Sequence, residues 1–299
     1  MKKSKRFAVW ANTGKNKFWD TLPMLLEWAA QEKLEPYLTT RIDKLWSKQG
    51  HCHYGVVKSA DDFYNMDFIL TLGGDGTILG AVRAMGNRNV PLLGIHLGDL
   101  GFLANVTLQD LYPRLNQVAR GEYHLDYRTV LTGTIISSRK TIVHPALNDI
   151  VINPTKSHRM ITCIVRANGL LLGRYSADGV IIATPTGSTA YSLAAGGPIV
   201  EPGVASYVVT PICPHTLTFR PVVVSSGTTI EITFPEGTKD VGLTVDGQIH
   251  EDIDDQSKVI VRTGDYTVPF IQFDDLDYFQ MLRKKMDWGK RGDNQSGAG

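Results

Sequence analysis

The chain has 299 residues, of which 42% are hydrophobic, so it can bury a substantial core in one large domain or, as we favour, in two ordinary ones. It carries 31 Lys and Arg against 30 Asp and Glu, a formal net charge of +1, which excludes the strong basic footprint of a protein that binds nucleic acid or an anionic membrane. An anionic ligand must therefore be held by local groups.

The start of the chain and its cysteines bear on its compartment. The basic start MKKSKR is followed only by the apolar run FAVWA, which is too short for the core of a signal peptide, so we expect a cytoplasmic protein. Cys52, Cys163 and Cys213 lack CxxC spacing and predict neither a disulfide framework nor a zinc site. The cluster HCH at residues 51–53 lacks the ligand spacing of a metal site, and we favour a loop without function there.

Residues 1–122 alternate between strand-like and helical patterns, in the order RFAVW, FWDTLPMLLEWAAQ, DFILTL, TILGAVRAM, VPLLGI and LQDLYPRLNQVA. This alternation is typical of βα units on a mostly parallel sheet. We therefore predict an N-terminal α/β domain over residues 1–122.

Residues 123–273 have almost no helical periodicity and carry short runs rich in Val, Ile and Thr, among them TCIVRA, VIIAT, TIEITF and VIVRT. Such runs predict antiparallel strands, and hence a C-terminal β-sandwich-like domain. The following stretch, about 274–292, is helical in pattern and is expected to pack back on the first domain. Residues 293–299, DNQSGAG, are predicted to be disordered.

The pentapeptide GGDGT at residues 73–77 follows the strand-like run DFILTL. Its glycines can take positive φ and let the backbone approach a bulky anion, and the next run opens a helix, whose N-terminus attracts phosphate. The charge of Asp75 would repel phosphate, so this side chain needs another purpose: it can accept the proton of an attacking hydroxyl or help to hold magnesium. The structural alternative is a helix cap or an Asx turn.

Between Asp178 and Arg220 the only formally charged residue is Glu201. Five prolines interrupt this stretch, so it is no transmembrane helix. Its part PTGSTAYSLAAGGP holds too many small and hydroxylic residues for a packed core strand. We predict a loop that offers backbone amides and hydroxyls to a ligand.

Neither a Walker loop nor a G-x-G-x-x-G fingerprint occurs in the chain. GGDGT after a strand resembles the motif of a kinase superfamily that includes NAD kinases, diacylglycerol kinases and sphingosine kinases, with a close variant in phosphofructokinases. Further segments are similar to the successive signatures of NAD kinases: LNDIVI (147–152), SADGVIIATPTGSTAYSLAAGGPIV (176–200), PHTLTFRPVVV (214–224) and DGQ (246–248), with GIHLGDLGFL (94–103) similar to another family segment. The resemblance implies transfer of the γ-phosphoryl group of ATP to the 2′-hydroxyl of the adenosine ribose of NAD, which makes NADP.

The resemblance also implies roles for residues. Asp75 matches the proton acceptor, and Gly74 and Gly76 let the phosphates approach. Asn148 and Asp149 match an Asn-Asp/Glu pair suited to the vicinal hydroxyls of a ribose, with a buried turn as the structural alternative.

The resemblance also implies nucleotide contacts by residues 189–194, a block within the motif PTGSTAYSLAAGGP. This block supplies hydroxyls and backbone groups, and the ring of Tyr191 offers a flat face for adenine, although core packing explains a Tyr equally well. Asp178 could hold the nicotinamide carboxamide or form a plain turn. The residues of the block are Thr189, Ala190, Tyr191, Ser192, Leu193 and Ala194.

Some positions are carried over from the family alone. Arg159 is a candidate phosphate or nucleotide contact and Gln248 a candidate amide contact. Both are candidates to act from a neighbouring subunit, and both could instead be solvated surface residues. His215 and Arg220 lie in a family signature and are expected only to shape a loop. Ser176 stands where many bacterial relatives carry Arg and others Gly, which leaves preference between NAD and NADH open.

The resemblance implies a homodimer or homotetramer, and a Mg²⁺ requirement that follows from the charge of ATP. ATP, another nucleoside triphosphate and inorganic polyphosphate remain alternative phosphoryl donors. A diacylglycerol-type lipid kinase is disfavoured by the near-neutral charge and the absence of a basic amphipathic helix. A non-catalytic dinucleotide sensor is disfavoured because Asp75 is present. Since GGDGT falls in one domain and LNDIVI in the other, we expect the site in a cleft between them.

Overall fold

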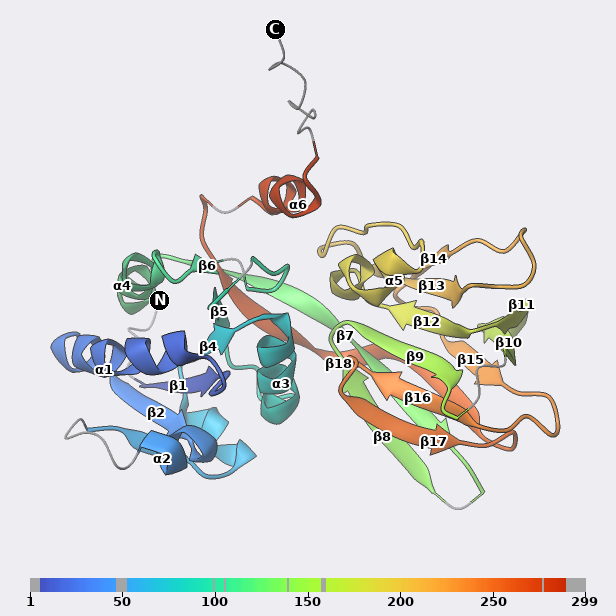
Figure 1. Ribbon diagram of the computed structural model, residues 1–299, viewed down its shortest axis with the longest axis horizontal. Helices are drawn as coiled ribbons and strands as arrows, with labels where there is room; N and C mark the ends of the chain where they lie inside the picture. Colours follow the sequence, from blue (N-terminus) through green and yellow to red (C-terminus); the bar gives the residue numbers. More distant parts are fainter. Residues whose placement is uncertain are drawn as a thin grey trace, which may run out of the picture. The chain divides into compact units, whose positions relative to one another are not determined.

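A computed structural model of the chain describes residues 6–46, 53–98, 100–104, 106–138, 140–156, 160–275 and 277–288 (Figure 1). The chain divides into two compact units. We call Met1–Asp126 with Pro269–Gly299 the α/β unit, and Tyr127–Val268 the β unit. The α/β unit thus takes residues from both ends of the chain.

The α/β unit is built on a parallel sheet. Its strand order is β3-β2-β1-β4-β5, with β6 and the last residues of β18 both paired with β5, and every one of these pairings is parallel. The elements are β1 (Arg6–Ala11), α1 (Asn16–Gln31), β2 (Glu35–Thr39), α2 (Thr40–Trp46), β3 (Gly55–Val57), the 3₁₀ helix η1 (Ala60–Asn65), β4 (Phe68–Gly73), α3 (Asp75–Met85), β5 (Leu92–His96), β6 (Val106–Thr107), α4 (Leu111–Arg120) and α6 (Tyr278–Met286). The predicted α/β fold is confirmed.

The core of the α/β unit follows from helical and strand periodicity. Helix α1 buries Phe18, Leu22 and Leu25, which recur at the spacing of one helical face. On the sheet the rings of Phe7 and Phe68, from neighbouring strands, stack with centroids 5.0 Å apart. Strand β4 is buried throughout, as expected for a parallel strand covered on both faces. This buried strand ends at the first glycine of the GGDGT motif.

The β unit contains two sheets. One has the antiparallel order β11-β10-β15-β18, with β7 paired to β18 and β8, and the other the antiparallel order β14-β13-β12-β9-β16-β17. The elements are β7 (His124–Ile136), β8 (Thr141–Ala146), β9 (Asp149–Pro154), β10 (Ile161–Ala167), β11 (Leu170–Ala177), β12 (Gly179–Ala183), η2 (Thr186–Thr189), α5 (Tyr191–Ala194), β13 (Ser206–Ile212), β14 (Val222–Ser225), β15 (Ile230–Thr233), β16 (Val241–Val245), β17 (Ile249–Ile253) and β18 (Lys258–Gln272).

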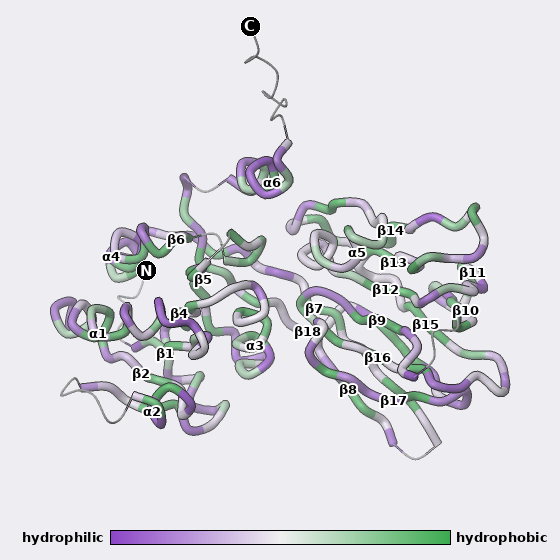
Figure 2. Tube along the Cα trace, viewed as in Figure 1, coloured by the Kyte–Doolittle hydropathy of each residue, from purple (hydrophilic) through white to green (hydrophobic). Residues whose placement is uncertain are grey.

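The two sheets share one apolar core. Ile150 and Ile152 of β9 pack in the same cluster as Cys163 and Val165 of β10, and Figure 2 shows hydrophobic stretches in the strands of this unit. The predicted β-sandwich-like unit is confirmed. Cys163 is a free thiol in this core, and burial raises its pKa to about 12.

Strand β9 divides its side chains between two faces because successive residues alternate. Ile150 and Ile152 enter the sandwich core, whereas Val151 joins Ile181 in a smaller cluster on the other face of the sheet. Asp149 and Asn153 share this second face with Val151. The side chains of the outer face of β9 are therefore available to line a site.

Helix α6 belongs to the α/β unit. The Asp277 side chain caps it by accepting a hydrogen bond of 2.9 Å from the Phe279 amide, and Leu282 is buried. The predicted C-terminal helix is confirmed. Residues 51 and 52 of the HCH cluster and the predicted disordered segment 293–299 lie outside the described residues.

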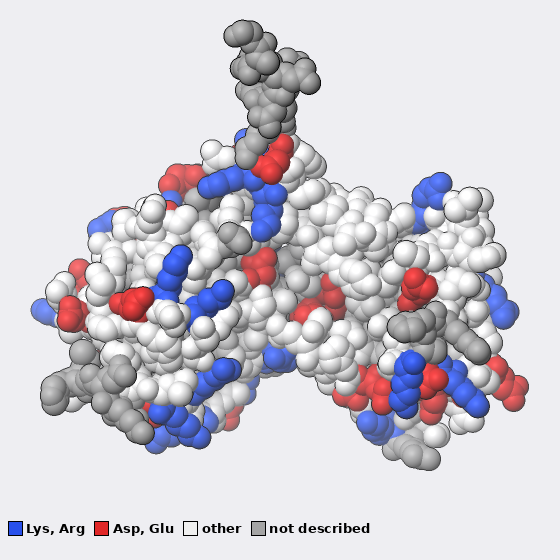
Figure 3. Space-filling model, in the orientation of Figure 1, with Lys and Arg blue, Asp and Glu red and all other residues white. Residues whose placement is uncertain are grey.

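The surface carries both signs of charge. On the face that Figure 3 shows, Lys and Arg are interspersed with Asp and Glu, in keeping with the formal net charge of +1. Within the described part of the chain, no helix has the length and hydropathy to cross a membrane.

Candidate active site

The GGDGT motif forms the junction between β4 and α3. Gly74 is the N-cap residue of α3 with φ −109° and ψ −173°, and none of the motif's glycines has a positive φ. The expectation of positive φ is therefore wrong. Glycine is needed at Gly73 for space, because a Cβ there would lie 2.2 Å from Thr77 Oγ1. A Cβ at Gly74 would meet nothing within 4 Å, so the surface beside the helix start is open.

The Asp75 carboxylate is held by three successive backbone amides. Phe102 N donates to Oδ2 at 2.9 Å, and Leu103 N and Ala104 N donate to Oδ1 at 3.1 and 3.2 Å. Asp75 thus neither caps α3 nor forms an Asx turn; it binds a second segment. A carboxylate has about four acceptor sites, so one remains on Oδ2.

The donor segment reaches Asp75 because it follows β5, the parallel neighbour of β4. Gly73 is the register partner of His96, and Leu97 N donates to Gly73 O at 3.2 Å. Gly101 has a steric purpose: a Cβ there would lie 2.0 Å from Asp75 Oδ1. The segment GIHLGDLGFL therefore helps to orient the Asp75 carboxylate through its Phe102 and Leu103 amides. The sequence did not reveal this role, because any residue can supply a backbone N–H.

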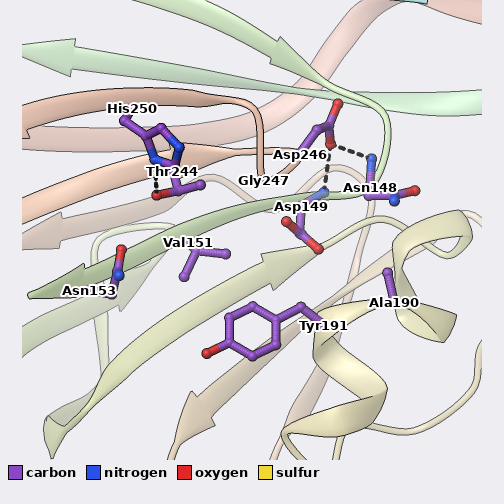
Figure 4. Close-up of a pocket in the computed structure, with 10 residues that line it drawn as sticks. All are labelled: Asn148, Asp149, Val151, Asn153, Ala190, Tyr191, Thr244, Asp246, Gly247 and His250. Atoms are coloured by element: carbon purple, nitrogen blue, oxygen red, sulfur yellow. Dashed lines mark hydrogen bonds between the residues drawn. The ribbon is translucent and has the colours of Figure 1, made fainter. Parts of the chain in front are cut away.

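A pocket of about 440 Å³ lies on the outer face of β9, within the β unit. Val151, Thr244 and His250 are register partners on β9, β16 and β17 and form its floor. Figure 4 shows the lining residues, which are Asn148, Asp149, Val151, Asn153, Ala190, Tyr191, Thr244, Asp246, Gly247 and His250. Of the predicted site residues, the fold thus brings Asn148, Asp149, Ala190 and Tyr191 together.

Asp246 organises this pocket. Its Oδ1 accepts hydrogen bonds from Asn148 N at 2.7 Å and Asp149 N at 3.1 Å, and its Oδ2 accepts from Leu147 N at 3.0 Å. Two of these bonds are drawn in Figure 4. The sequence placed Asp246 in the DGQ motif but assigned it no role. The available signal was Asp-Gly itself, a turn dipeptide, and both residues have positive φ here, +49° and +64°.

Asp149 is 5% exposed and lies beside Asp246. Burial, and then the negative charge of Asp246, raise the pKa of Asp149 to about 7. Figure 4 shows its carboxylate directed to the Tyr191 side of the pocket. Among the described residues no hydrogen bond reaches this carboxylate, so its oxygens are available to a ligand hydroxyl.

The segment 184–194 packs tightly on Asn148. Thr184 N donates to Asn148 O at 2.8 Å, and a Cβ at Gly187 would lie 2.0 Å from that same oxygen. The hydroxyls of Ser188 and Ser192 are fully buried and bond within the protein, Ser192 to Thr210 at 2.9 Å. The small residues thus serve close packing more than the predicted display of hydroxyls.

The more exposed residues of segment 184–194 lie where η2 ends and α5 begins. Tyr191 is 48% exposed and Ala190 also lines the pocket. The Thr189 hydroxyl donates to Thr186 O at 3.1 Å; Leu193 is half-buried and Ala194 is exposed. The Tyr191 ring is therefore the clearest candidate of this block for contact with a base.

The remaining predicted residues do not line the pocket. The Ser176 hydroxyl pairs with that of Thr162 at 3.1 Å, and Asp178 is exposed between β11 and β12. Gln248 is exposed in the turn between β16 and β17, next to the lining residue Gly247. Arg159 lies outside the described residues.

Known proteins match the chain along most of its length. The family model described as the ATP-NAD kinase N-terminal domain matches residues 11–123, and that of the ATP-NAD kinase C-terminal domain matches residues 147–273. The chain belongs to the NAD kinase family. It is 37% identical to the NAD kinase of Koribacter versatilis over 292 residues, which cover 96% of this chain and 99% of that one, and 37% identical to the NAD kinase of Geotalea daltonii over 288 residues, which cover 96% and 100%.

Solved structures agree with this membership of the NAD kinase family. Yeast NADH kinase complexed with NADH has a TM-score of 0.91 and 26% identity, over 99% of this chain and 91% of that one. An NAD kinase from Archaeoglobus fulgidus in complex with ATP has a TM-score of 0.73 and 26% identity, over 94% and 98%. The chain is therefore an ATP-dependent enzyme that phosphorylates NAD to NADP, and the alternatives of a lipid kinase and a sensor are discarded.

Proposed function

We propose that Asp75 is the proton acceptor of this NAD kinase. The observation that carries this proposal is the carboxylate's orientation by three backbone amides, with one acceptor site left on Oδ2. In the reaction the 2′-hydroxyl gives its proton to Asp75, the 2′-oxygen forms a bond to the γ-phosphorus, and the bond from that phosphorus to the bridging oxygen breaks, so that ADP leaves.

The start of α3 suits the transferred phosphoryl group. The N-terminus of this helix carries partial positive charge, and the open surface at Gly74 lets phosphate oxygens approach the backbone. Gly76 is exposed in the first turn of the helix. The transferred phosphate and the Asp75 carboxylate would then both lie at the carboxyl end of β4.

A second pocket in the α/β unit suits the rest of the triphosphate donor. It has about 430 Å³, and its lining includes Trp10, Thr39, Arg41, Lys58 and Phe63. It lies where β1, β2 and β3 end, and the carboxyl ends of parallel strands are the usual ligand edge of an open α/β sheet. The exposed Arg41 and Lys58 supply the positive charge that ATP needs, and the sequence had not singled them out.

The pocket on β9 suits the acceptor dinucleotide. Asp149 can accept hydrogen bonds from ribose hydroxyls, Asn148 can donate and accept, and Tyr191 can stack on adenine. Transfer requires the reacting atoms about 3–3.5 Å apart. The 2′-hydroxyl of the bound dinucleotide must therefore come this close to the γ-phosphorus of ATP.

We also propose the metal, the compartment, the oligomeric state and an alternative acceptor of this enzyme. Mg²⁺ enters with ATP, since the charge of the triphosphate demands it. The enzyme works in the cytoplasm as a homodimer or homotetramer, in which Arg159 and Gln248 serve a neighbouring subunit's site. Asp178 holds the nicotinamide carboxamide, and Ser176 bears on the preference between NAD and NADH. Because one structural relative is an NADH kinase, NADH is an alternative acceptor.

Mass spectrometry of the acceptor tests this function. Incubation with Mg-ATP and NAD should add one phosphate to NAD, whereas an NAD analogue that lacks the 2′-hydroxyl of the adenosine ribose should stay unchanged. Parallel reactions with NADH and polyphosphate identify the preferred pair. Phosphorylation of the analogue would contradict the proposed acceptor atom.

A further inference from the structure

The segment that holds Asp75 is secured unevenly along its length. Its far end is fixed by burial, because Leu103 and Ala104 are 4% and 0% exposed. Its near end is fixed by the hydrogen bond of 3.2 Å from Leu97 N to Gly73 O. Between them, Leu100 and Phe102 are only half-buried. Yet, among the residues that the structure describes, Phe102 alone donates a hydrogen bond to Asp75 Oδ2, the oxygen with the remaining acceptor site.

Helix α6 reaches this middle part through the side chain of Lys285. Lys285 Nζ donates a hydrogen bond to Leu100 O, and it lies 5.9 Å from the centroid of the Phe102 ring, within the range of a cation–π contact. Both contacts lie within the α/β unit. Figure 3 shows basic side chains where Figure 1 places α6.

We infer that Lys285 is a positioning residue for the proton acceptor: from α6 it holds Leu100 and Phe102 so that the Phe102 amide orients Asp75 Oδ2. The inference rests on the proposed role of Asp75. A shift of about 1 Å in a reacting group can cost up to about a hundredfold in rate, so a support for one hydrogen bond is enough to matter.

Lys285 can be removed without removing the helix. The side chain is exposed, and α6 keeps its Asp277 cap and its buried Leu282. Lys284 is a matched control, since it is also exposed on the last turn of α6 and has no hydrogen bond or ion pair to the described residues. Arg at position 285 would keep a donor and a cation.

The test compares kcat, KM for NAD and melting temperature among Lys285→Met, Lys285→Arg and Lys284→Met. Lys285→Met should lower kcat about 3- to 10-fold, within the range expected for the loss of one hydrogen bond of typical net strength. The KM for NAD should stay within about twofold, as expected when ground-state binding is unaffected. Lys285→Arg should recover most of the kcat, and Lys284→Met should match the wild type.

A double variant identifies the route of the effect. If Lys285 acts through Asp75, adding Lys285→Met to Asp75→Asn should cause no further loss of the residual kcat. The inference is overturned by wild-type kcat in Lys285→Met, by an equal loss in both backgrounds, or by a loss that follows melting temperature and is not rescued by Arg. Full activity of Asp75→Asn would instead remove the proposed base itself, and the inference with it.

Discussion

Asp75 in the α/β unit and Asp246 in the β unit are bound in the same way. Each carboxylate accepts hydrogen bonds from three consecutive backbone amides, two on Oδ1 and one on Oδ2, at 2.9–3.2 Å for Asp75 and 2.7–3.1 Å for Asp246. The difference lies in their neighbours. Asp75 stands at a helix start with an open surface, whereas Asp246 stands beside the buried acid Asp149.

A carboxylate that is oriented by three backbone amides need not be the carboxylate that reacts. Three amides can lock a carboxylate that reacts, as proposed for Asp75, or one that shapes a loop, as Asp246 does for residues 147–149. In the β9 pocket the group available to substrate is the neighbour, Asp149. The same bonding pattern thus predicts different losses on substitution.

Asp75→Asn should cause the largest loss. The Asn oxygen can still accept two of the three backbone hydrogen bonds, but the side chain cannot take a proton, so kcat should fall about 10²- to 10⁴-fold. The KM for NAD should change little, because the β9 pocket is untouched. Steady-state kinetics measure kcat and the KM for NAD. A kcat near that of the wild type would show that Asp75, like Asp246, does not react.

Gly101→Ala should come next. Its Cβ would lie 2.0 Å from Asp75 Oδ1 and would displace the carboxylate without changing it chemically, so kcat should fall about 10- to 100-fold. Gly98→Ala is the matched control in the same segment, because a Cβ there meets nothing within 4 Å. Equal rates for the two variants would show that the position of Asp75 does not matter.

Asp246→Asn should affect binding more than turnover. Asn tolerates the positive φ at this position, but it cannot serve all three amides, so we expect a stability loss of about 1–3 kcal/mol and a rise in the KM for NAD of about tenfold. Asp252→Ala, at an exposed residue of β17, should change neither quantity. A kcat loss as large as that of Asp75→Asn would show that Asp246 itself reacts.

Asp149 should make the affinity for NAD depend on pH. With its pKa raised to about 7, the carboxyl is protonated in mild acid and ionised above, and the ionised form is the better acceptor for ribose hydroxyls. The KM for NAD should therefore fall several-fold as pH rises through 7. In Asp149→Asn this dependence should vanish; its persistence would assign it to another group.

The same acid links stability to pH, with a definite sign. The folded pKa lies above the ordinary value of 3.8, so the folded state binds the proton more tightly and loses this stabilisation as pH rises from about 4 to about 7. Denaturant titrations should show Asp149→Asn gaining stability relative to the wild type between pH 5 and pH 8, on the order of 1–4 kcal/mol.

Periodicity predicted the fold well because it reports burial directly. The alternation of patterns before residue 123 and the Val- and Ile-rich runs after it correspond to the parallel strands of the α/β unit and the antiparallel strands of the β unit. The GGDGT motif was correctly expected between a strand and a helix. Helical and strand periods depend only on which side chains face a core, and one sequence records that information.

The site was less predictable because much of it is backbone. The amides that bind Asp75 could belong to any residue, and the buried hydroxyl of Ser192 cannot be distinguished in sequence from one offered to a ligand. Period-2 alternation in LNDIVI could have marked Asp149 and Val151 as one face, but the apolar run concealed it. The pairing of Asp246 with residues 147–149 depends on contacts about a hundred positions apart, as the separations of 97–99 residues show.

The most direct test of the account is a crystal structure with NAD and a non-hydrolysable ATP analogue, from which the distance between Asp75 Oδ2 and the 2′-oxygen of the adenosine ribose is measured. We predict a hydrogen bond of about 2.6–3.2 Å, with the three amides still bound to the carboxylate. A 2′-hydroxyl bonded to Asp149 instead, with Asp75 beyond the reach of even one bridging water, would contradict the assignment of the proton acceptor.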